Sequence, residues 1–455
     1  MAKIILKNIY TLMTDTFSPC LSGVDLKIDG NKIEEIGVNL ESSGYEAIDC
    51  SRHVVIPGLV NTHHHFYQTL TRNLPAVQNA KLFDWLLYLY DVWKGIDSEA
   101  VYYSSALAMA ELVKTGCTCT TDHHYLYPKN FDGDIMSLQF EAADKIGMRF
   151  SPTRGSMCLS RKDGGLPPDS VVQSEEEILY DSERCIKQFH DPSPMAMHKI
   201  VLAPCSPFSV TKDIMKESAK LARRYGVNLH THLCETKDEE DTCMRMYGLR
   251  PVELMEECSF IGPDVFYAHG IWFNDEELSI LKQKGANIAH CPSSNMRLGS
   301  GICRVREMLD MGINVSLAVD GSASNDSSDM LGEARMALLL QRVKYGSEAL
   351  SARDVFKIAT VNGAKALSFG NVGELKPGWA ADIAVFDVST IPYAGSHSDP
   401  LASLIFCGTN HEAEYTIING EFALYKGKLV SFDEEELAAK ANEISKRLIE
   451  KSLEK

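Results

Sequence analysis

Hydrophobic residues at the two ends of the chain recur at intervals typical of short β-strands. Near the N-terminus the segments IILKNIYTLM, VDLKIDG, KIEEIGV and HVVIPGLV are separated by Gly, Asn and Asp, which favour turns. After Ala366 the pattern returns in GELKPGWAADIAVFDV and AEYTIINGEFALYKGKLV, in which Asn419 and Gly420 form a hairpin-turn signal. We therefore expect residues 1–55 and 366–432 to pair into one small composite β-sandwich domain.

Between these ends, apolar runs of strand length alternate with longer helical patterns that often end in Gly. The runs are IPGLVNTH, CTCTTDHH, IGMRFSPTR, KIVLAPCS, GVNLHTHL, DVFYAHG, ANIAHCPS and INVSLAVD. Buried parallel strands are continuously apolar, as these runs are. The pattern predicts an α/β fold in which residues 56–365 form a (β/α)₈ TIM-like barrel. Residues 433–455 are predicted to form a charged amphipathic helix that is solvated or packs against a partner.

Several predicted strands end in residues that can bind a metal. Catalytic groups of such barrels lie at the C-terminal ends of the strands. The first strand ends in His63 and His65, and residues two apart in a strand point to the same side. The strand GVNLHTHLCE supplies a second pair, His230 and His232, followed by Glu235. A carboxylate at this place is suited to move protons for a metal-activated water.

Two further strands end in residues of the same kind. DVFYAHG ends in His269, and INVSLAVDG brings Asp320 directly after an apolar run. Each residue alone has an ordinary structural explanation, such as a turn or a helix cap. Together they predict one divalent metal, Zn²⁺ in preference to Fe²⁺. The strand KIVLAPCSPF ends without Lys, Asp or Glu, so we expect no second metal.

These motifs resemble the amidohydrolase superfamily, and within it the deaminases and chlorohydrolases of nitrogen heterocycles. The resemblance rests on PGLVNTHHH, HTHLCE, YAHG, AVDGSASND and VGELKPGWAADIAVFD and covers essentially the whole chain. The segments NTHHHFYQTLTRNLP, TTDHHYLYP, LAPCSPFSVT and AHCPSSNMRLGSGI are most similar to the 8-oxoguanine deaminases, whose relatives are often labelled hydroxyatrazine ethylaminohydrolases. An isoxanthopterin deaminase is similar as well.

The resemblance implies roles for particular residues. The implied metal ligands are His63, His65, His232 and Asp320. Glu235, His269 and Asp320 would be catalytic: Glu235 protonates a ring nitrogen, His269 bonds the developing oxygen and Asp320 accepts a proton from water. Gln68 would hydrogen-bond the heterocycle, as a glutamine does in similar guanine deaminases.

The same resemblance suggests the substrate. Similar guanine deaminases carry an arginine on the strand that here contains Cys205 and Ser206. Because N7 carries hydrogen and C8 a carbonyl in 8-oxoguanine, loss of that donor favours conversion of 8-oxoguanine to urate and ammonia. Isoxanthopterin and hydroxy-s-triazines are alternative substrates. Cys205 and His123 are further predicted substrate contacts. The aromatic stretch of Trp85, Tyr88, Tyr90 and Trp93 is expected to form a lid over a planar base or, alternatively, to pack as a helix or in a subunit interface.

Composition and charge limit the classes of molecule that this protein is expected to bind. The chain has 455 residues and a formal net charge of -17, which argues against a nucleic-acid partner. We find no apolar run long enough to span a membrane and no export signal, and the 13 cysteines contain no Cys-x-x-Cys. These features predict a cytoplasmic enzyme with a small heterocyclic substrate and no membrane partner. We expect it to assemble with further copies of itself as a homo-oligomer. The alternative of another class, a non-catalytic barrel scaffold, disagrees with the complete set of metal and acid–base residues.

Overall fold

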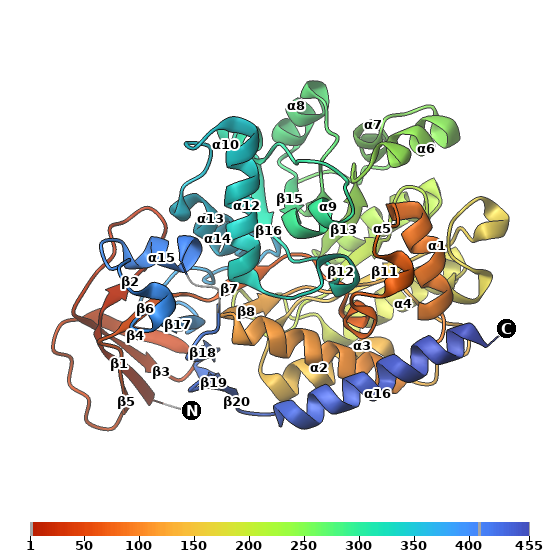
Figure 1. Ribbon diagram of the computed structural model, residues 1–455. Coiled ribbons are helices and arrows are strands. Elements are labelled where there is room, and N and C mark those ends of the chain that lie inside the picture. The colour runs from red at the N-terminus through yellow and green to blue at the C-terminus, as the bar shows by residue number, and fades with distance from the viewer. Residues whose placement is uncertain (1–2, 408–410, 455) are drawn as a thin grey trace.

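The computed structural model describes residues 3–407 and 411–454 (Figure 1). Two β-sheets lie beside a barrel. The first sheet has the order β4-β3-β1-β5 and comprises β1 (Lys3–Ile9), β3 (Val24–Asp29), β4 (Lys32–Gly37) and β5 (Glu46–Asp49). The second has the order β2-β6-β17-β18-β19-β20 and comprises β2 (Thr11–Leu12), β6 (His53–Pro57), β17 (Ile383–Asp387), β18 (Tyr415–Ile418), β19 (Glu421–Tyr425) and β20 (Lys428–Leu429).

The second sheet joins the two ends of the chain. Strand β6 pairs antiparallel with β17, so that Val55 lies opposite Val385. Side chains from both sheets form one apolar cluster, to which Leu6 and Leu26 contribute from the first sheet and Ile383 from the second. Alternating apolar residues therefore meet between two sheets, and the prediction of a β-sandwich built from both termini is confirmed.

The barrel consists of eight parallel strand positions, two of which are interrupted. The strands are β7 (Leu59–Asn61), β8 (Cys117–Thr120) with β9 (His123–His124), β10 (Arg149–Phe150) with β11 (Thr153–Ser156), β12 (Val201–Pro204), β13 (Asn228–Leu233), β14 (Val265–His269), β15 (Asn287–His290) and β16 (Asn314–Leu317). The ring closes where the backbone N–H and hydroxyl of Thr62 donate to the Leu317 carbonyl, at 3.1 and 2.9 Å. The predicted α/β barrel is confirmed.

Helices surround the barrel strands (Figure 1). They are α1 (Leu82–Trp93), α2 (Ser98–Lys114), α3 (Ile135–Ile146), α4 (Glu175–Phe189), α5 (Lys212–Tyr225), α6 (Lys237–Tyr247), α7 (Pro251–Glu257), α8 (Asp275–Lys284), α9 (Pro292–Arg297), α10 (Val305–Met311), α11 (Ser322–Asn325), α12 (Met330–Tyr345), α13 (Ala352–Ala359), α14 (Val361–Ala366) and α15 (Pro400–Phe406). Short 3₁₀ turns are η1 (Phe66–Thr71), η2 (Pro75–Val77), η3 (Arg161–Asp163), η4 (Asp169–Val171) and η5 (Ile391–Tyr393). Helices α3 and α5 end at Gly147 and Gly226, whose φ angles of 80° and 68° suit a residue without a side chain.

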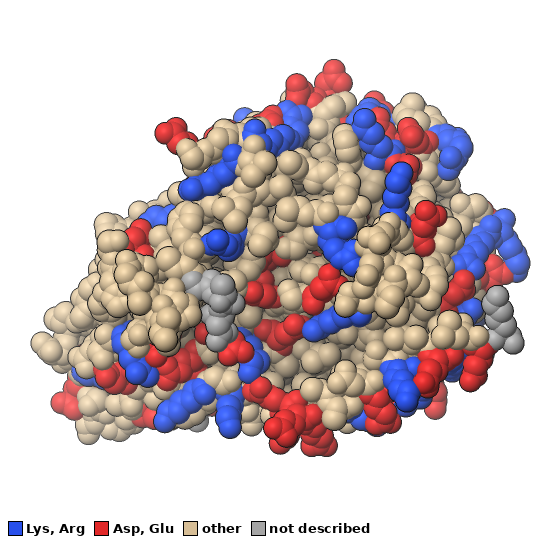
Figure 2. All heavy atoms as spheres, in the orientation of Figure 1, with Lys and Arg blue, Asp and Glu red and all other residues tan. Residues whose placement is uncertain are grey.

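The last helix, α16 (Glu434–Leu453), packs along α1, α2 and η1 of the same chain. Its buried face contains Leu437, Ile444 and Leu448. The amphipathic pattern of this segment thus covers the outside of the barrel. Among the described residues, no helix combines the length and apolarity needed to cross a bilayer. Acidic and basic side chains are interspersed over the face shown in Figure 2.

A buried ion pair connects the barrel to the composite domain. Arg149 on β10 donates from Nε and Nη2 to the carboxylate of Asp382, at 2.7 and 2.9 Å. Its Nη1 donates to the carbonyls of Met195 and Ala196, and Asp382 also accepts from the Asn419 backbone N–H. The charges are therefore paired and hydrogen-bonded, as burial requires.

Candidate metal centre and active site

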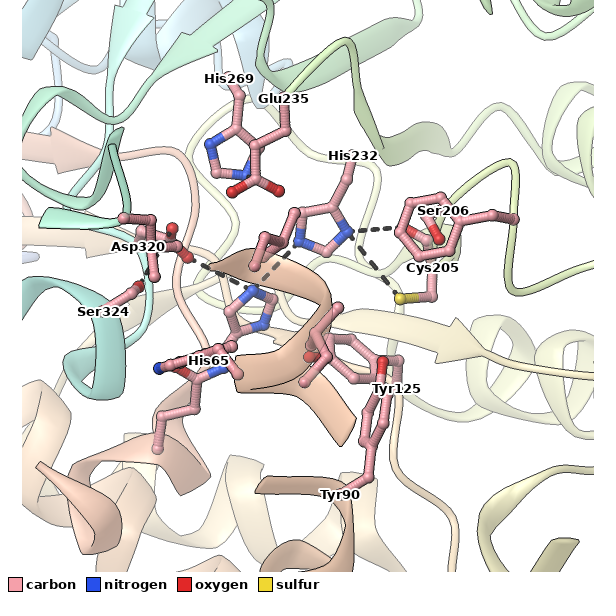
Figure 3. A pocket seen from close by; sticks show the side chains of 16 residues that line it. His65, Tyr90, Tyr125, Cys205, Ser206, His232, Glu235, His269, Asp320 and Ser324 are labelled. Carbon is pink, nitrogen blue, oxygen red and sulfur yellow. Dashed lines mark hydrogen bonds and ion pairs between the residues drawn. The ribbon is translucent and has the colours of Figure 1, made fainter. Parts of the chain in front are cut away.

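The strand-end residues singled out in the sequence meet at one end of the barrel (Figure 3). His63 and His65 follow β7, His232 lies in β13, and Asp320 follows β16. Because parallel strands end together, residues far apart in sequence become neighbours here. His65, His232 and Asp320 border a cavity whose free space, open solvent included, is about 440 Å³. It is lined by His65, Gln68, Leu82, Trp85, Leu86, Tyr90, Tyr125, Cys205, Ser206, Phe208, His232, Glu235, His269, Leu298, Asp320 and Ser324.

Backbone contacts fix the proton positions of two imidazoles. His65 Nδ1 lies 2.8 Å from the carbonyl oxygen of His123, and His232 Nδ1 lies 2.6 Å from that of Cys205. A carbonyl only accepts, so each Nδ1 carries hydrogen. Burial lowers the pKa of both rings, which leaves a lone pair on each Nε2. These two nitrogens face each other at 3.2 Å, an arrangement that a cation between them stabilises.

A third imidazole and a carboxylate complete this set. His63 Nε2 is buried and has no hydrogen-bond partner among the described residues. It lies 3.4 Å from Asp320 Oδ1, which is also 3.4 Å from His65 Nε2. Histidine nitrogens and carboxylate oxygens are ligands that zinc and iron(II) accept. The donor set therefore fits a divalent metal ion, with the orphaned Nε2 as the most direct sign.

Glu235 and His269 lie beside this set on the cavity wall (Figure 3). Burial raises the pKa of Glu235 to about 7, so the carboxyl can hold a proton at neutral pH. His269 Nε2 lies 3.6 Å from Glu235 Oε2, and its Nδ1 donates to Asn295 Oδ1 at 3.0 Å. Burial opposes the charged form of His269, but the carboxylates of Glu235 and Asp320 outweigh it and raise its pKa. The pair can hold and move a proton next to the metal ligands.

The backbone at three of these strand ends adopts a left-handed conformation. Cys234, His269 and Asp320 have φ angles of 56°, 75° and 65°. Such angles are uncommon for residues with side chains and cluster at functional sites. They turn Asp320 and His269 into the cavity just where each strand stops. The sequence patterns carried no indication of this feature.

Two buried carboxylates support the catalytic loops and were missed in the sequence. Glu239, in the first turn of α6, accepts from the backbone N–H groups of Cys234 and Glu235 at 2.7 and 3.1 Å. Asp122 accepts from the N–H of Phe66 at 2.6 Å, immediately after the metal-site histidines. Burial raises the pKa of both carboxyls to about 7. Glu239 stands in the run KDEED, where neighbouring acids give no means of choosing it.

Gln68 lies on η1 with its side chain on the cavity wall. Its Oε1 is buried and has no partner among the described residues, so it is available to a ligand. Gly321 packs directly against this amide, because a Cβ there would lie 2.0 Å from Gln68 Oε1. The glycine after Asp320 thus makes room for Gln68.

The two remaining predicted contacts occupy different positions. Cys205 lines the cavity, and burial raises the pKa of its thiol to about 12, so the thiol is neutral. His123 is fully buried and is not among the lining residues; its ring stacks on His232 at 4.7 Å, and its Nε2 donates to the Ala203 carbonyl at 3.2 Å. One of its ring nitrogens lies within 4.8 Å of ligand atoms of His63, His65 and His232. A contact between His123 and substrate stays a prediction.

Aromatic side chains form much of the opposite wall. Trp85 and Tyr90 of α1 line the cavity, and Tyr125 and Phe208 join them. Of the other two residues in the aromatic stretch, Trp93 is packed in the core and Tyr88 is exposed, so a lid stays a prediction. Flat apolar surface of this kind suits the face of a planar heterocycle. No local pattern selects Tyr125 or Phe208, because their approach depends on loops from different strands.

Comparison with known proteins agrees with this geometry. The chain is 46% identical over 423 residues to an 8-oxoguanine deaminase from Pseudomonas aeruginosa, covering 92% of this chain and 94% of that protein. It is 35% identical to a hydroxydechloroatrazine ethylaminohydrolase from Pseudomonas sp. strain ADP, over 96% and 93% of the two chains. An isoxanthopterin deaminase from an unknown prokaryotic organism is 34% identical, over 94% and 92%.

Solved structures show the same architecture. An atrazine chlorohydrolase from Arthrobacter aurescens, crystallised with zinc, superposes with a TM-score of 0.92 at 29% identity and covers 97% of this chain and 100% of that one. The family model described as "Amidohydrolase family" matches residues 54–423, which span the barrel and the strands β17 and β18 of the second sheet. With its barrel, its strand-end histidines and its aspartate, this chain belongs to the amidohydrolase family.

Proposed function

We propose that this protein is a zinc-dependent hydrolytic deaminase of an amino-oxo purine, with 8-oxoguanine as the substrate and urate and ammonia as the products. The observation that carries the proposal is that ligand atoms of His63, His65, His232 and Asp320 approach one another to 3.2–3.4 Å. Glu235, whose pKa burial raises to about 7, lies beside them on the cavity wall. The similarity to a deaminase of that substrate supports it.

The residues of the site have complementary parts in this reaction. When bound, zinc lowers the pKa of a coordinated water toward neutrality. Asp320 is placed to accept a proton from water, and protonated Glu235 to donate one to the ring nitrogen next to the reacting carbon. His269 is oriented by Asn295, so that its Nε2 faces Glu235 and can bond the developing oxygen. Water supplies the new carbonyl oxygen, the exocyclic C–N bond breaks, and ammonia leaves.

The cavity wall favours an oxidised purine over guanine. Its lining contains neither Lys nor Arg, whereas Gln68, Cys205 and Ser206 offer neutral polar groups. Guanine presents N7 as a hydrogen-bond acceptor, so a pocket for guanine needs a hydrogen-bond donor opposite N7. In 8-oxoguanine N7 carries hydrogen and C8 a carbonyl, so the required pattern reverses. Buried polar mismatches discriminate strongly between such analogues.

Ammonia release by zinc-loaded protein tests the proposal with 8-oxoguanine, guanine, isoxanthopterin and hydroxyatrazine. We expect dominant turnover of 8-oxoguanine. Preference for isoxanthopterin or the triazine would keep the deaminase chemistry and overturn the substrate assignment. Bound zinc without turnover of any compound would favour the scaffold alternative. Assembly as a homo-oligomer and a cytoplasmic location stay predictions of the sequence.

A further inference from the structure

His230 has no role in the site described so far. It lies two residues before His232 on β13, and alternate residues of a strand point to the same side. His230 is fully buried and is not among the residues that line the cavity. The repeated histidine pair of this strand therefore places one imidazole at the cavity and the other one layer deeper in the barrel.

Hydrogen bonds define the proton position on His230. Its Nδ1 lies 2.7 Å from the carbonyl oxygen of Phe266 on the adjacent strand β14. A carbonyl cannot donate, so this nitrogen carries the hydrogen. An imidazole that carries its hydrogen on Nδ1 offers a lone pair on Nε2, and this nitrogen lies among the rings of His63 and His123.

This lone pair in turn defines the proton position on His63. His230 Nε2 lies 2.8 Å from His63 Nδ1, so His63 must be the donor. The hydrogen of His63 is then on Nδ1, and its lone pair is on Nε2. That lone pair is the one that faces Asp320 Oδ1 without a hydrogen-bond partner.

We propose that His230 is a positioning residue for the metal centre: it accepts the Nδ1 proton of His63 and so keeps the His63 Nε2 lone pair directed at the metal. The chain of contacts runs from a backbone carbonyl of β14 through one imidazole to the next. It does for His63 what the carbonyls of His123 and Cys205 do for the other two ligands. The inference rests on the proposed metal centre.

Packing offers a way to separate this role from a merely structural one. The His230 ring stacks on the Phe266 ring, with centroids 4.1 Å apart and planes 19° apart. Phenylalanine at position 230 keeps a flat ring there and deletes the acceptor. Glutamine places an amide oxygen near the position of Nε2 and restores an acceptor. Loss of such an outer contact to a metal ligand lowers metal affinity about 10–100-fold.

The test measures the zinc dissociation constant by competition with a chromophoric chelator, for unmodified protein, His230→Phe and His230→Gln. The matched control is His290→Phe, which replaces a fully buried imidazole of β15 whose ring nitrogens have no partner among the described residues. We expect His230→Phe to weaken zinc binding about 10–100-fold and His230→Gln to recover most of it. The control should bind zinc like the unmodified protein.

Two results would overturn the inference: His230→Phe binding zinc within about threefold of the unmodified protein, or His290→Phe losing as much affinity. If His230→Phe fails to fold, ¹⁵N-histidine spectra of the unmodified metal-free protein decide instead. They should show His63 protonated at Nδ1, with its signals assigned by their loss in His63→Gln; protonation at Nε2 would refute the inference. If the unmodified protein binds no zinc at all, the proposed metal centre fails, and the tautomer of His63 still tests the hydrogen-bond chain.

Discussion

A single methyl group at position 321 tests whether the Gln68 amide binds substrate. Gly321 has φ −71° and ψ 142°, which alanine adopts without strain, so Gly321→Ala leaves the local backbone unperturbed. The new Cβ would lie 2.0 Å from Gln68 Oε1 and 2.4 Å from Gln68 Cδ. Real contacts are never this short, so the amide must move away from its position on the cavity wall.

The expected drop in kcat/KM follows from the hydrogen bond to substrate that the Gln68 amide would lose. Gln68 Oε1 is buried without a partner in the described structure, which leaves it free to bond the heterocycle. Leaving such a buried polar contact unmade costs about 1–3 kcal/mol. At about 1.4 kcal/mol per factor of ten, Gly321→Ala should lower kcat/KM about 5–150-fold.

Steady-state kinetics on the preferred heterocycle measure this loss. Zinc content is determined in parallel, since the Gly321 N–H donates to Asp320 Oδ1 at 2.6 Å. Gln68→Ala should cause a similar loss, and the double variant should lose no more than either single one, because both act on one contact. Unchanged kcat/KM in Gly321→Ala, or losses that add in the double variant, would refute the reasoning.

Three further predictions concern buried carboxyls and the buried ion pair. Because burial raises the pKa of Glu235 to about 7, its proton is present below and lost above this pH, so kcat should fall on the alkaline side. Glu235→Gln should lower kcat about 10²–10⁴-fold with zinc content intact and abolish that alkaline limb; a flat profile in unmodified protein would contradict the assignment. Glu239→Gln turns an amide hydrogen toward one of the two backbone N–H groups that the carboxylate accepts from. It should lower kcat about 5–150-fold at nearly constant KM. Kinetics equal to those of the unmodified protein would refute a positioning role for Glu239. Arg149→Leu should reduce the free energy of unfolding in urea by about 3–5 kcal/mol by stranding Asp382, and additional replacement of Asp382 by Asn should recover part of it.

The fold and the meeting of these strand-end side chains could be predicted because their signals are local. Continuous apolar runs indicate buried parallel strands, and the pairs at His63/His65 and at His230/His232 follow the two-residue period of a strand. Since such strands end together, residues at their ends converge whatever their spacing in the chain. The sequence did not distinguish the positions of His230 and His232, because depth in the barrel depends on strand register.

The supporting residues could not be predicted because they act through contacts that no local pattern encodes. Glu239 and Asp122 are ordinary acids in the sequence, and their value lies in the backbone N–H groups they reach. Gly321 is one glycine among 31, and its purpose appears only when the Gln68 amide lies against it. These residues can be identified only from their neighbours in the folded structure, not from the composition of the chain.

The pairing of β6 with β17 has a consequence for synthesis of the chain on the ribosome. Val55 cannot pair until Val385 has been synthesised, 330 residues later. At about 5–20 residues per second, this interval lasts roughly 15–65 s. During that time β2 and β6 lack the C-terminal strands of their sheet, and unpaired strand edges invite association with other chains. The barrel can form from residues already made, whereas the composite sandwich is completed last, and a chaperone that holds the N-terminal segment should raise the yield of folded protein.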